Sequence, residues 1–196
     1  MTHRKSKGIT KFTARMFLNP ILLLVMALLA PLSYAQDTAA PSFTLANADG
    51  GQVTLPRLHD GVDIYFFWAS WCPYCKALMP HLQSMRIEYG DDVTIYALNI
   101  RDEDMPENLL AERGYDFILL PEADPVMPLY GVRATPGLFV LDGKGNIRFN
   151  LYDVVFNDSD EFKALSHGKK AGQRAPYWAA EIRMVIDQVL SESSGE

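Results

Sequence analysis

The two cysteines of the chain, Cys72 and Cys75, are separated only by Pro73 and Tyr74. A cysteine pair at this spacing can bind a metal, form a structural disulfide or exchange disulfides with other molecules. A structural zinc site usually needs a second such pair, and the sequence holds no further cysteine. A structural disulfide that closes so short a loop removes little entropy from the unfolded chain. The spacing therefore favours a redox pair.

The surrounding residues place this pair between a strand and a helix. Residues 62–70 form a nearly continuous apolar and aromatic run, which is typical of a strand buried on both faces. In residues 73–90 the apolar side chains recur every three to four positions and a glycine follows, which predicts a helix and its end. We therefore expect Cys72 at the N-cap of this helix, Pro73 in its first turn and Cys75 one turn inside.

A cysteine at a helix N-terminus is activated as a nucleophile. The free N–H groups and the positive end of the helix dipole stabilise its thiolate. A free cysteine titrates near ~8.5, and such environments lower its pKa to roughly 3.5–7.5. We expect an exposed Cys72 to attack a disulfide and Cys75, tucked behind it, to resolve the mixed disulfide. These two residues are the predicted catalytic pair, and their own disulfide replaces any cofactor or metal.

The elements that must hold this pair predict an α/β domain with mixed strand directions. A hairpin is predicted around Asp49-Gly50-Gly51, and its two extended pieces lie in residues 43–58. Further strands are expected at 92–100, near 117–121 and in a second hairpin at 137–153. A short helix is expected at 106–114 and a closing helix at 176–190. Residues 154–175 lack clean periodicity and predict a long loop or insertion.

The N-terminal segment has the composition of an export signal. Five basic residues and no acid precede the ten apolar residues 21–30, and Ser33 and Ala35 precede Gln36 like the small residues of a cleavage site. Ten helical residues span about 15 Å, half of a ~30 Å hydrocarbon core. The sequence predicts a cleaved signal in residues 1–35, or alternatively an uncleaved membrane anchor, then a tether at 36–42 and the domain at 43–196. Both alternatives place the domain in the periplasm.

The charge of the remaining chain argues against nucleic acid as a partner. Removing the five N-terminal basic residues from the total of 18 leaves 13, against 24 acidic residues. Phosphate backbones are bound through lysine and arginine, so an acidic domain is poorly suited to them.

Two segments resemble the active-site segments of the thioredoxin superfamily: "FFWASWCPYCKALMP" (66–80) and "YGVRATPGLFVLDGKGNI" (130–147). With the N-terminal hairpin, the signal and an inserted helix and strand after residue 100, the chain is similar to the TlpA/ResA-like (DsbE-like) extracytoplasmic branch. This resemblance implies a thioredoxin fold, with a central mixed β-sheet flanked by helices, an N-terminal β-hairpin and a helix–strand insertion.

The resemblance also implies a substrate-binding surface. Trp71 matches the aromatic residue beside the nucleophile, and Thr135 and Pro136 match a docking turn in which the proline is cis and Thr135 offers backbone hydrogen bonds to an extended partner. Pro73 and Tyr74, the pair found in glutaredoxins, complete the predicted surface and tune the reduction potential.

The chain departs from the family pattern at two positions. Phe66 stands where thioredoxins carry a buried acid, and Leu78 stands where ResA-like proteins carry a glutamate. Either carboxylate would assist proton transfer at the resolving cysteine.

The resemblance implies a periplasmic thiol-disulfide oxidoreductase whose substrates are cysteine-containing extracytoplasmic proteins. Reduction is the favoured direction, for example in cytochrome c maturation or for metal-binding cysteines, and a DsbD/CcdA-like membrane protein would supply electrons. Two alternatives stay open: a disulfide-donating oxidase or isomerase, and a Cu(I)-binding chaperone. The membrane is expected as a partner only through an uncleaved N-terminal segment.

Overall fold

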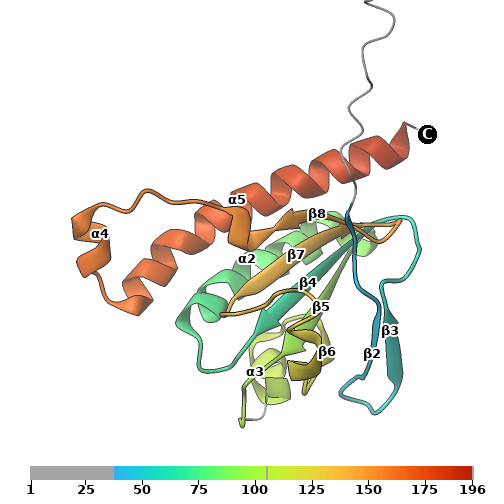
Figure 1. Cartoon of the computed structure of the whole chain (residues 1–196), viewed down its shortest axis with the longest axis horizontal. Coiled ribbons are helices and arrows are strands. Elements are labelled where there is room, and N and C mark those ends of the chain that lie inside the picture. Colours follow the sequence, from blue (N-terminus) through green and yellow to red (C-terminus); the bar gives the residue numbers. More distant parts are fainter. Residues whose placement is uncertain (1–37, 105, 196) are drawn as a thin grey trace, which may run out of the picture. The chain divides into compact units, whose positions relative to one another are not determined.

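The computed structural model describes residues 38–104 and 106–195, and a six-stranded mixed sheet lies at the centre of this part (Figure 1). The strand order is β1-β8-β7-β4-β5-β6. The central strand β4 is parallel to β5 and antiparallel to β7. The bounds are β1 (Thr38–Ala39), β4 (Val62–Trp68), β5 (Val93–Asn99), β6 (Ile118–Leu120), β7 (Gly137–Asp142) and β8 (Asn146–Asn150).

Alternate residues of β4 point to opposite faces of the sheet and bury two separate apolar clusters. On one face Ile64 and Phe66 pack with apolar residues of α2 (Pro73–Tyr89) and α5 (His167–Ser194), and α3 (Pro106–Arg113) contributes Leu110. On the other face Tyr65 and Phe67 pack with the hairpin β2 (Phe43–Ala46) and β3 (Gln52–Leu55) and with the segment around the 3-10 helix η2 (Asp124–Val126). The predicted α/β class, with a mixed sheet flanked by helices, an N-terminal hairpin and a helix–strand insertion, is confirmed.

The sheet brings three connections to one edge. Because β4 and β5 are parallel, their carboxyl ends lie at the same edge, and β7, which is antiparallel to β4, begins there. The pairing of Phe67 with Gly137 marks this edge. Cys72 follows β4 and Thr135 precedes β7, so residues far apart in the sequence meet at this edge.

The prediction of a loop at 154–175 is wrong for most of its length. A short helix, α4 (Asp160–Ala164), lies within it, and α5 begins at His167, so that Pro176 lies inside α5 rather than in its first turn. The first turns of α5 bury Ala171 and Ala175, which continue the apolar face of the later turns. Alanines carry this face, so the sequence shows no periodic row of large apolar residues there. In Figure 1, α4 and the first turns of α5 extend beyond the sheet.

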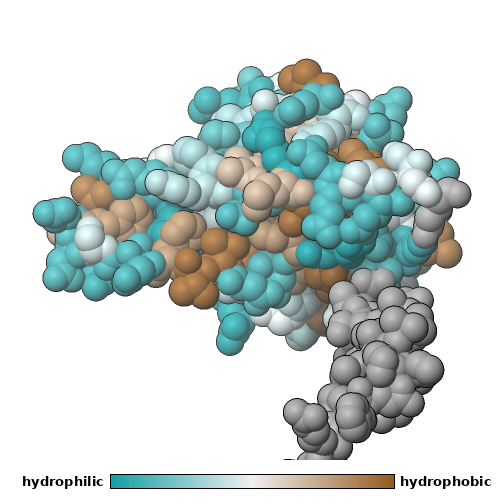
Figure 2. Space-filling model, turned by 90° about the horizontal axis from the view of Figure 1, so that it is seen from above, coloured by the Kyte–Doolittle hydropathy of each residue, from teal (hydrophilic) through white to brown (hydrophobic). Residues whose placement is uncertain are grey.

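The exposed side of α5 is largely polar. Seen from above the view of Figure 1, the visible surface is mostly hydrophilic, with separate hydrophobic patches (Figure 2). This is the pattern of a helix that buries one face only.

The predicted tether at 36–42 also differs from the structure. Thr38 and Ala39 form β1 and pair with β8, and the hydroxyl of Tyr130 donates a 2.8 Å hydrogen bond to the carbonyl oxygen of Pro41. The backbone of β8 offers an edge that this segment covers, so residues 38–41 are part of the domain. The predicted signal or anchor at 1–35 lies outside the described residues. Within residues 38–104 and 106–195, no helix has the length and apolar character needed to cross a membrane.

Candidate functional site

Cys72 caps the N-terminus of α2. Its backbone is extended (φ −79°, ψ 115°), Pro73 occupies the first turn, and the backbone N–H of Cys75 donates to the Cys72 sulfur over 3.4 Å. A proline fits this turn because its missing N–H would have no partner within the helix. The predicted placement of all three residues is confirmed.

Hydrogen bonding makes Cys72 the more acidic thiol of the pair. Its pKa is lowered to about 6, chiefly by the hydrogen bond from the Cys75 thiol, with support from Thr135 and from the backbone N–H groups of Cys75 and Tyr74; burial opposes this shift. At neutral pH Cys72 is therefore largely a thiolate.

Cys75 has the opposite character. It is fully buried among apolar residues, and burial raises its pKa well above the ordinary value, as do the hydrogen bond with Cys72 and the charge of Cys72. Cys75 thus keeps its proton while Cys72 loses its own. One cysteine is ready to attack, and the other becomes reactive only when its neighbour is no longer charged.

Cys72 is less accessible than the sequence predicts. Only 2% of it is exposed, because the segment that contains Thr135 lies against its sulfur, with 3.5 Å between Sγ and the Thr135 carbonyl oxygen. The sulfur belongs to the wall of a groove of about 520 Å³ rather than to a protruding helix tip. The residues that line this groove are Trp71, Cys72, Pro73, Tyr74, Arg101, Arg133, Ala134, Thr135 and His167.

The turn before β7 is held by an aromatic side chain. The peptide bond between Thr135 and Pro136 is cis, and Pro136 is buried. The hydroxyl of Tyr152, in the 3-10 helix η3 (Leu151–Asp153), donates a 2.5 Å hydrogen bond to the carbonyl oxygen of Ala134. A Cβ atom at Gly137 would come within 3.0 Å of that hydroxyl, so glycine permits this approach.

The turn before Cys72 is held by a carboxylate. Asp102 accepts hydrogen bonds from the backbone N–H and the hydroxyl of Ser70, at 2.5 and 2.8 Å, and from the side chain of Asn99 at 2.9 Å. The indole N–H of Trp71 donates to the carbonyl oxygen of Arg101 at 2.8 Å. The segment after β5 therefore supports the segment after β4.

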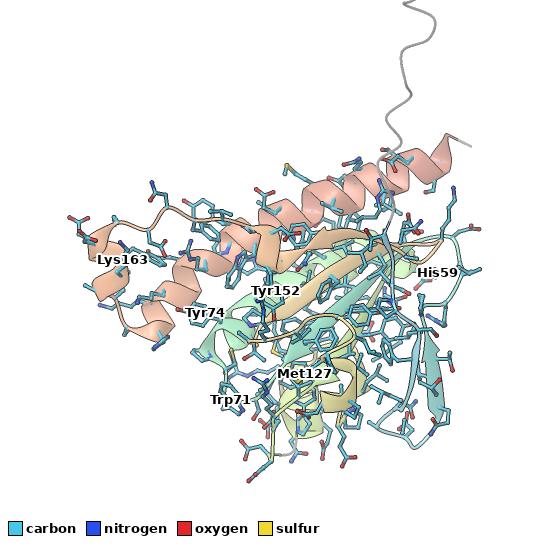
Figure 3. The ribbon with its side chains drawn as sticks, in the orientation of Figure 1. His59, Trp71, Tyr74, Met127, Tyr152 and Lys163 are labelled. Carbon is cyan, nitrogen blue, oxygen red and sulfur yellow. The ribbon has the colours of Figure 1, made fainter. Side chains whose placement is uncertain are left out.

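The structure gathers the predicted surface residues around Cys72. Trp71, Pro73, Tyr74 and Thr135 line the groove, and Pro136 lies buried next to Thr135. Trp71 is 55% exposed. In Figure 3, Trp71 and Tyr74 lie toward one end of the central sheet and His59 lies toward the other.

Sequence reasoning missed four residues of this region: Arg101, Arg133, Tyr152 and His167. Arg101 follows β5 as Cys72 follows β4, and the carboxyl ends of parallel strands are where sites form in open sheets, so that signal was available. His167 lies in the stretch expected to be a loop. Its ring meets that of Tyr74 edge to face, with 6.0 Å between centroids.

The two departures from the family pattern lie in the apolar core. Phe66 and Leu78 are both fully buried in the cluster that contains Cys75. Apolar surroundings at these positions contribute to the high pKa of Cys75. The described residues contain no group of three or more histidine, cysteine, aspartate or glutamate side chains placed to hold a metal ion.

Comparison with known proteins connects this site to a family. A family model described as "AhpC/TSA family" matches residues 37–150. The chain is 29% identical over 141 residues to thiol-disulfide oxidoreductase ResA of Geobacillus thermodenitrificans, covering 65% of this chain and 81% of that protein. It is 37% identical over 110 residues to a thiol:disulfide interchange protein DsbE homolog of Paracoccus denitrificans, covering 50% and 59%.

A solved structure gives the fold. The crystal structure of the thioredoxin domain of a thiol-disulfide oxidoreductase from Bacteroides vulgatus matches with a TM-score of 0.53 and 19% identity, covering 73% of this chain and 99% of that one. The predicted thioredoxin fold is confirmed.

Proposed function

The chain belongs to the AhpC/TSA family of thioredoxin-like proteins and is a thiol-disulfide oxidoreductase, and we propose that it reduces disulfides in extracytoplasmic partner proteins through Cys72 and Cys75. The observation that carries this proposal is the difference between the two thiols. Cys72, with a pKa of about 6, lies at a groove, whereas Cys75 is buried and has a raised pKa.

The reaction follows from this difference. The Cys72 thiolate attacks one sulfur of a partner disulfide, forms a mixed disulfide and releases the other partner sulfur as a thiolate. Once Cys72 is no longer charged, Cys75 loses its proton and attacks the Cys72 sulfur. The second partner sulfur leaves as a thiolate, which takes up a proton. The partner disulfide has gained two electrons, and the Cys72/Cys75 dithiol has lost them in becoming a disulfide.

The proton of Cys75 must leave without a neighbouring acid at the two family positions. Phe66 and Leu78 cannot accept a proton. We propose that solvent entering the groove accepts it when the partner docks. This makes the resolving step the slower of the two exchanges.

The pKa of Cys72 favours the reducing direction. A value of about 6 lies nearer to the ~7 of thioredoxin than to the ~3.5 of DsbA, whose reduced form is strongly stabilised. The same lowered pKa is the one observation in favour of the second candidate, disulfide donation, because a stabilised thiolate makes a dithiol pair more oxidising.

The location and the electron donor are parts of the proposal that rest on the N-terminal sequence. Residues 1–35 have the basic, apolar and small-residue order of an export signal. A protein working outside the cytoplasm needs a membrane dithiol protein to return its disulfide to the reduced form. A fusion of residues 1–35 to a reporter enzyme that is active only after export tests the location, and an inactive fusion would refute it.

Redox equilibration with glutathione decides the direction. We expect the midpoint reduction potential of the Cys72–Cys75 pair to lie below about −200 mV, between those of thioredoxin (~ −270 mV) and protein disulfide isomerase (~ −180 mV). A midpoint above about −150 mV would show that the protein donates disulfides.

Trapping identifies the partners. A Cys75→Ala variant expressed in the native host should accumulate mixed disulfides on Cys72, and mass spectrometry should name the attached proteins. A Cys72→Ala variant is the matched control. Equal recovery of proteins from both variants would remove the support for exchange through Cys72.

A further inference from the structure

The groove at Cys72 is positively charged although the protein is acidic. The ionisable side chains that line it, besides Cys72 and Tyr74, are those of Arg101, Arg133 and His167, and no carboxylate is among its lining residues. The whole chain has a net charge of −6. Arginine side chains are cationic and bind carboxylates through a planar fork of N–H donors. The groove is therefore a local basic site on an acidic molecule.

Arg101 is held in place by three neighbouring segments. Its backbone has a φ of +50°, a conformation that a residue with a side chain rarely adopts. Its N–H donates to the carboxylate of Asp124 at 3.2 and 3.3 Å, and its carbonyl oxygen accepts from the indole of Trp71. One guanidinium nitrogen donates to the carbonyl oxygen of Arg133 at 3.3 Å. Unusual backbone conformations of this kind collect at functional sites.

Arg133 lines the same groove, two residues before Thr135. It is exposed, and within the described part of the chain its side chain has no hydrogen bond or ion pair. The guanidinium of Arg101 uses one nitrogen for the carbonyl oxygen of Arg133, which leaves its other N–H groups for a ligand. Two neighbouring arginines thus offer donors within the groove that Cys72 lines.

A second hollow, which adjoins the groove, has the opposite charge. It shares Trp71 and Arg101 with the groove, and its other lining residues are Asp102, Glu103, Asp104 and Asp124. A uniformly acidic partner would be repelled there. The charge pattern therefore suits acidic residues at one place only, next to the sulfur that Cys72 attacks.

We propose that Arg101 and Arg133 are specificity-determining residues that select a polypeptide segment with a glutamate or aspartate beside its reacting cysteine. This inference rests on the proposed disulfide exchange. The partner that fits this groove is a polypeptide, because the groove is open and bordered by the half-exposed Trp71 and by Tyr74, side chains suited to packing against an extended chain.

The test measures the rate of disulfide exchange with short synthetic peptides. Each peptide contains one cysteine, joined by a disulfide to a chromophoric thiol whose release is followed by absorbance, and carries glutamate, glutamine or lysine beside that cysteine. Every rate is divided by the rate of the same peptide with dithiothreitol, which removes intrinsic differences in reactivity. We expect the glutamate peptide to react about tenfold faster than the lysine peptide at low salt, with the ratio approaching one near 0.5 M salt.

Four variants assign the effect to the two arginines. Arg101→Gln and Arg133→Gln should each lower the glutamate-to-lysine ratio about threefold, whereas Arg101→Lys should keep most of it. Arg113→Gln, which removes an equivalent exposed charge from the last turn of α3, should leave the ratio unchanged. Arg113→Gln should also leave the alkylation of Cys72 by neutral iodoacetamide as it is in the wild type.

The outcomes separate this inference from the proposed function. Equal rates with all three peptides, or a preference that survives both glutamine substitutions, would overturn the selectivity while leaving exchange intact. Exchange no faster than that of Cys72→Ala would overturn both. If glutathione disulfide reacted as fast as the glutamate peptide, the arginines would select a small anionic disulfide instead of a polypeptide.

Discussion

The sulfur of Cys72 lies 3.5 Å from the carbonyl oxygen of Thr135, a residue 63 positions later in the chain. This contact joins the segment after β4 to the turn before β7. The backbone that a docking partner would meet is therefore the same backbone that covers the attacking sulfur. Reactivity and recognition therefore depend on one small region.

Replacing Cys75 by alanine should raise the pKa of Cys72. The hydrogen bond from the Cys75 thiol is the largest cause of the lowered value, whereas the backbone N–H groups of residues 74 and 75 remain in the variant. The rate of iodoacetamide alkylation as a function of pH should have its midpoint near pH 6 in the reduced wild type and at least about one unit higher in Cys75→Ala. An unchanged midpoint would show that the helix N-terminus alone stabilises the thiolate.

The reduced protein should lose stability as the pH falls through the neutral range. Cys72 has a lower pKa in the folded state, about 6, than its ordinary value of 9.0, so its stabilising contribution is complete above the unfolded value and is lost as the pH approaches the folded one. Urea unfolding of the reduced wild type at about pH 8.5 and about pH 6 measures this loss.

A Cys72→Ala variant is the control for this pH dependence. It should show a smaller loss of unfolding free energy between the same two pH values. Cys75, whose pKa is raised in the folded state, contributes with the opposite sign, and only toward the upper end of this window, where it begins to ionise in the unfolded chain. The same slope in both proteins would contradict a lowered pKa of Cys72.

Replacing Tyr152 by phenylalanine should slow exchange with proteins and leave the chemistry of Cys72 unchanged. The hydroxyl holds the carbonyl oxygen of Ala134, next to Thr135, and does not touch the sulfur. We expect a loss of about 1 kcal/mol in unfolding free energy and a several-fold lower rate with a protein disulfide. Alkylation of Cys72 should keep its rate and its pH midpoint. A shifted midpoint would mean that Tyr152 acts on the thiolate rather than on the docking turn.

Replacing Gly172 by alanine should stabilise the protein by about 1 kcal/mol, because glycine is a poor helix former. Gly172 lies in α5, is exposed, and a Cβ atom there would meet nothing within 4 Å. Gly131→Ala is the matched contrast: it has equal space but a φ of +63°, so it should destabilise. Urea unfolding measures both variants. A Gly172→Ala variant that is no more stable than wild type would argue for a loop at this position.

The helix-capping cysteine pair and the α/β order of the elements around it can be predicted from the sequence. An apolar run predicts strand β4, and apolar residues at a three-to-four-residue spacing predict helix α2. Both are local patterns, so they can be recognised without the rest of the chain. The Thr135-Pro136 turn was placed by resemblance. By contrast, the early start of α5 depends on Ala171 and Ala175 being buried, and an alanine looks the same in the sequence whether it is buried or exposed.

The accessibility of Cys72 and the residues that surround it follow from the packing of distant segments. Thr135 covers the sulfur of Cys72, and Arg101 and Arg133 give the groove its charge. Arg101 lies in the segment after β5, and the other two lie in the segment before β7. Such contacts arise when a parallel β4–β5 pair and an antiparallel β7 bring their ends to one edge. Spacing along the chain does not predict which segments come into contact at this edge, because the pairing of strands determines these contacts and local propensity does not.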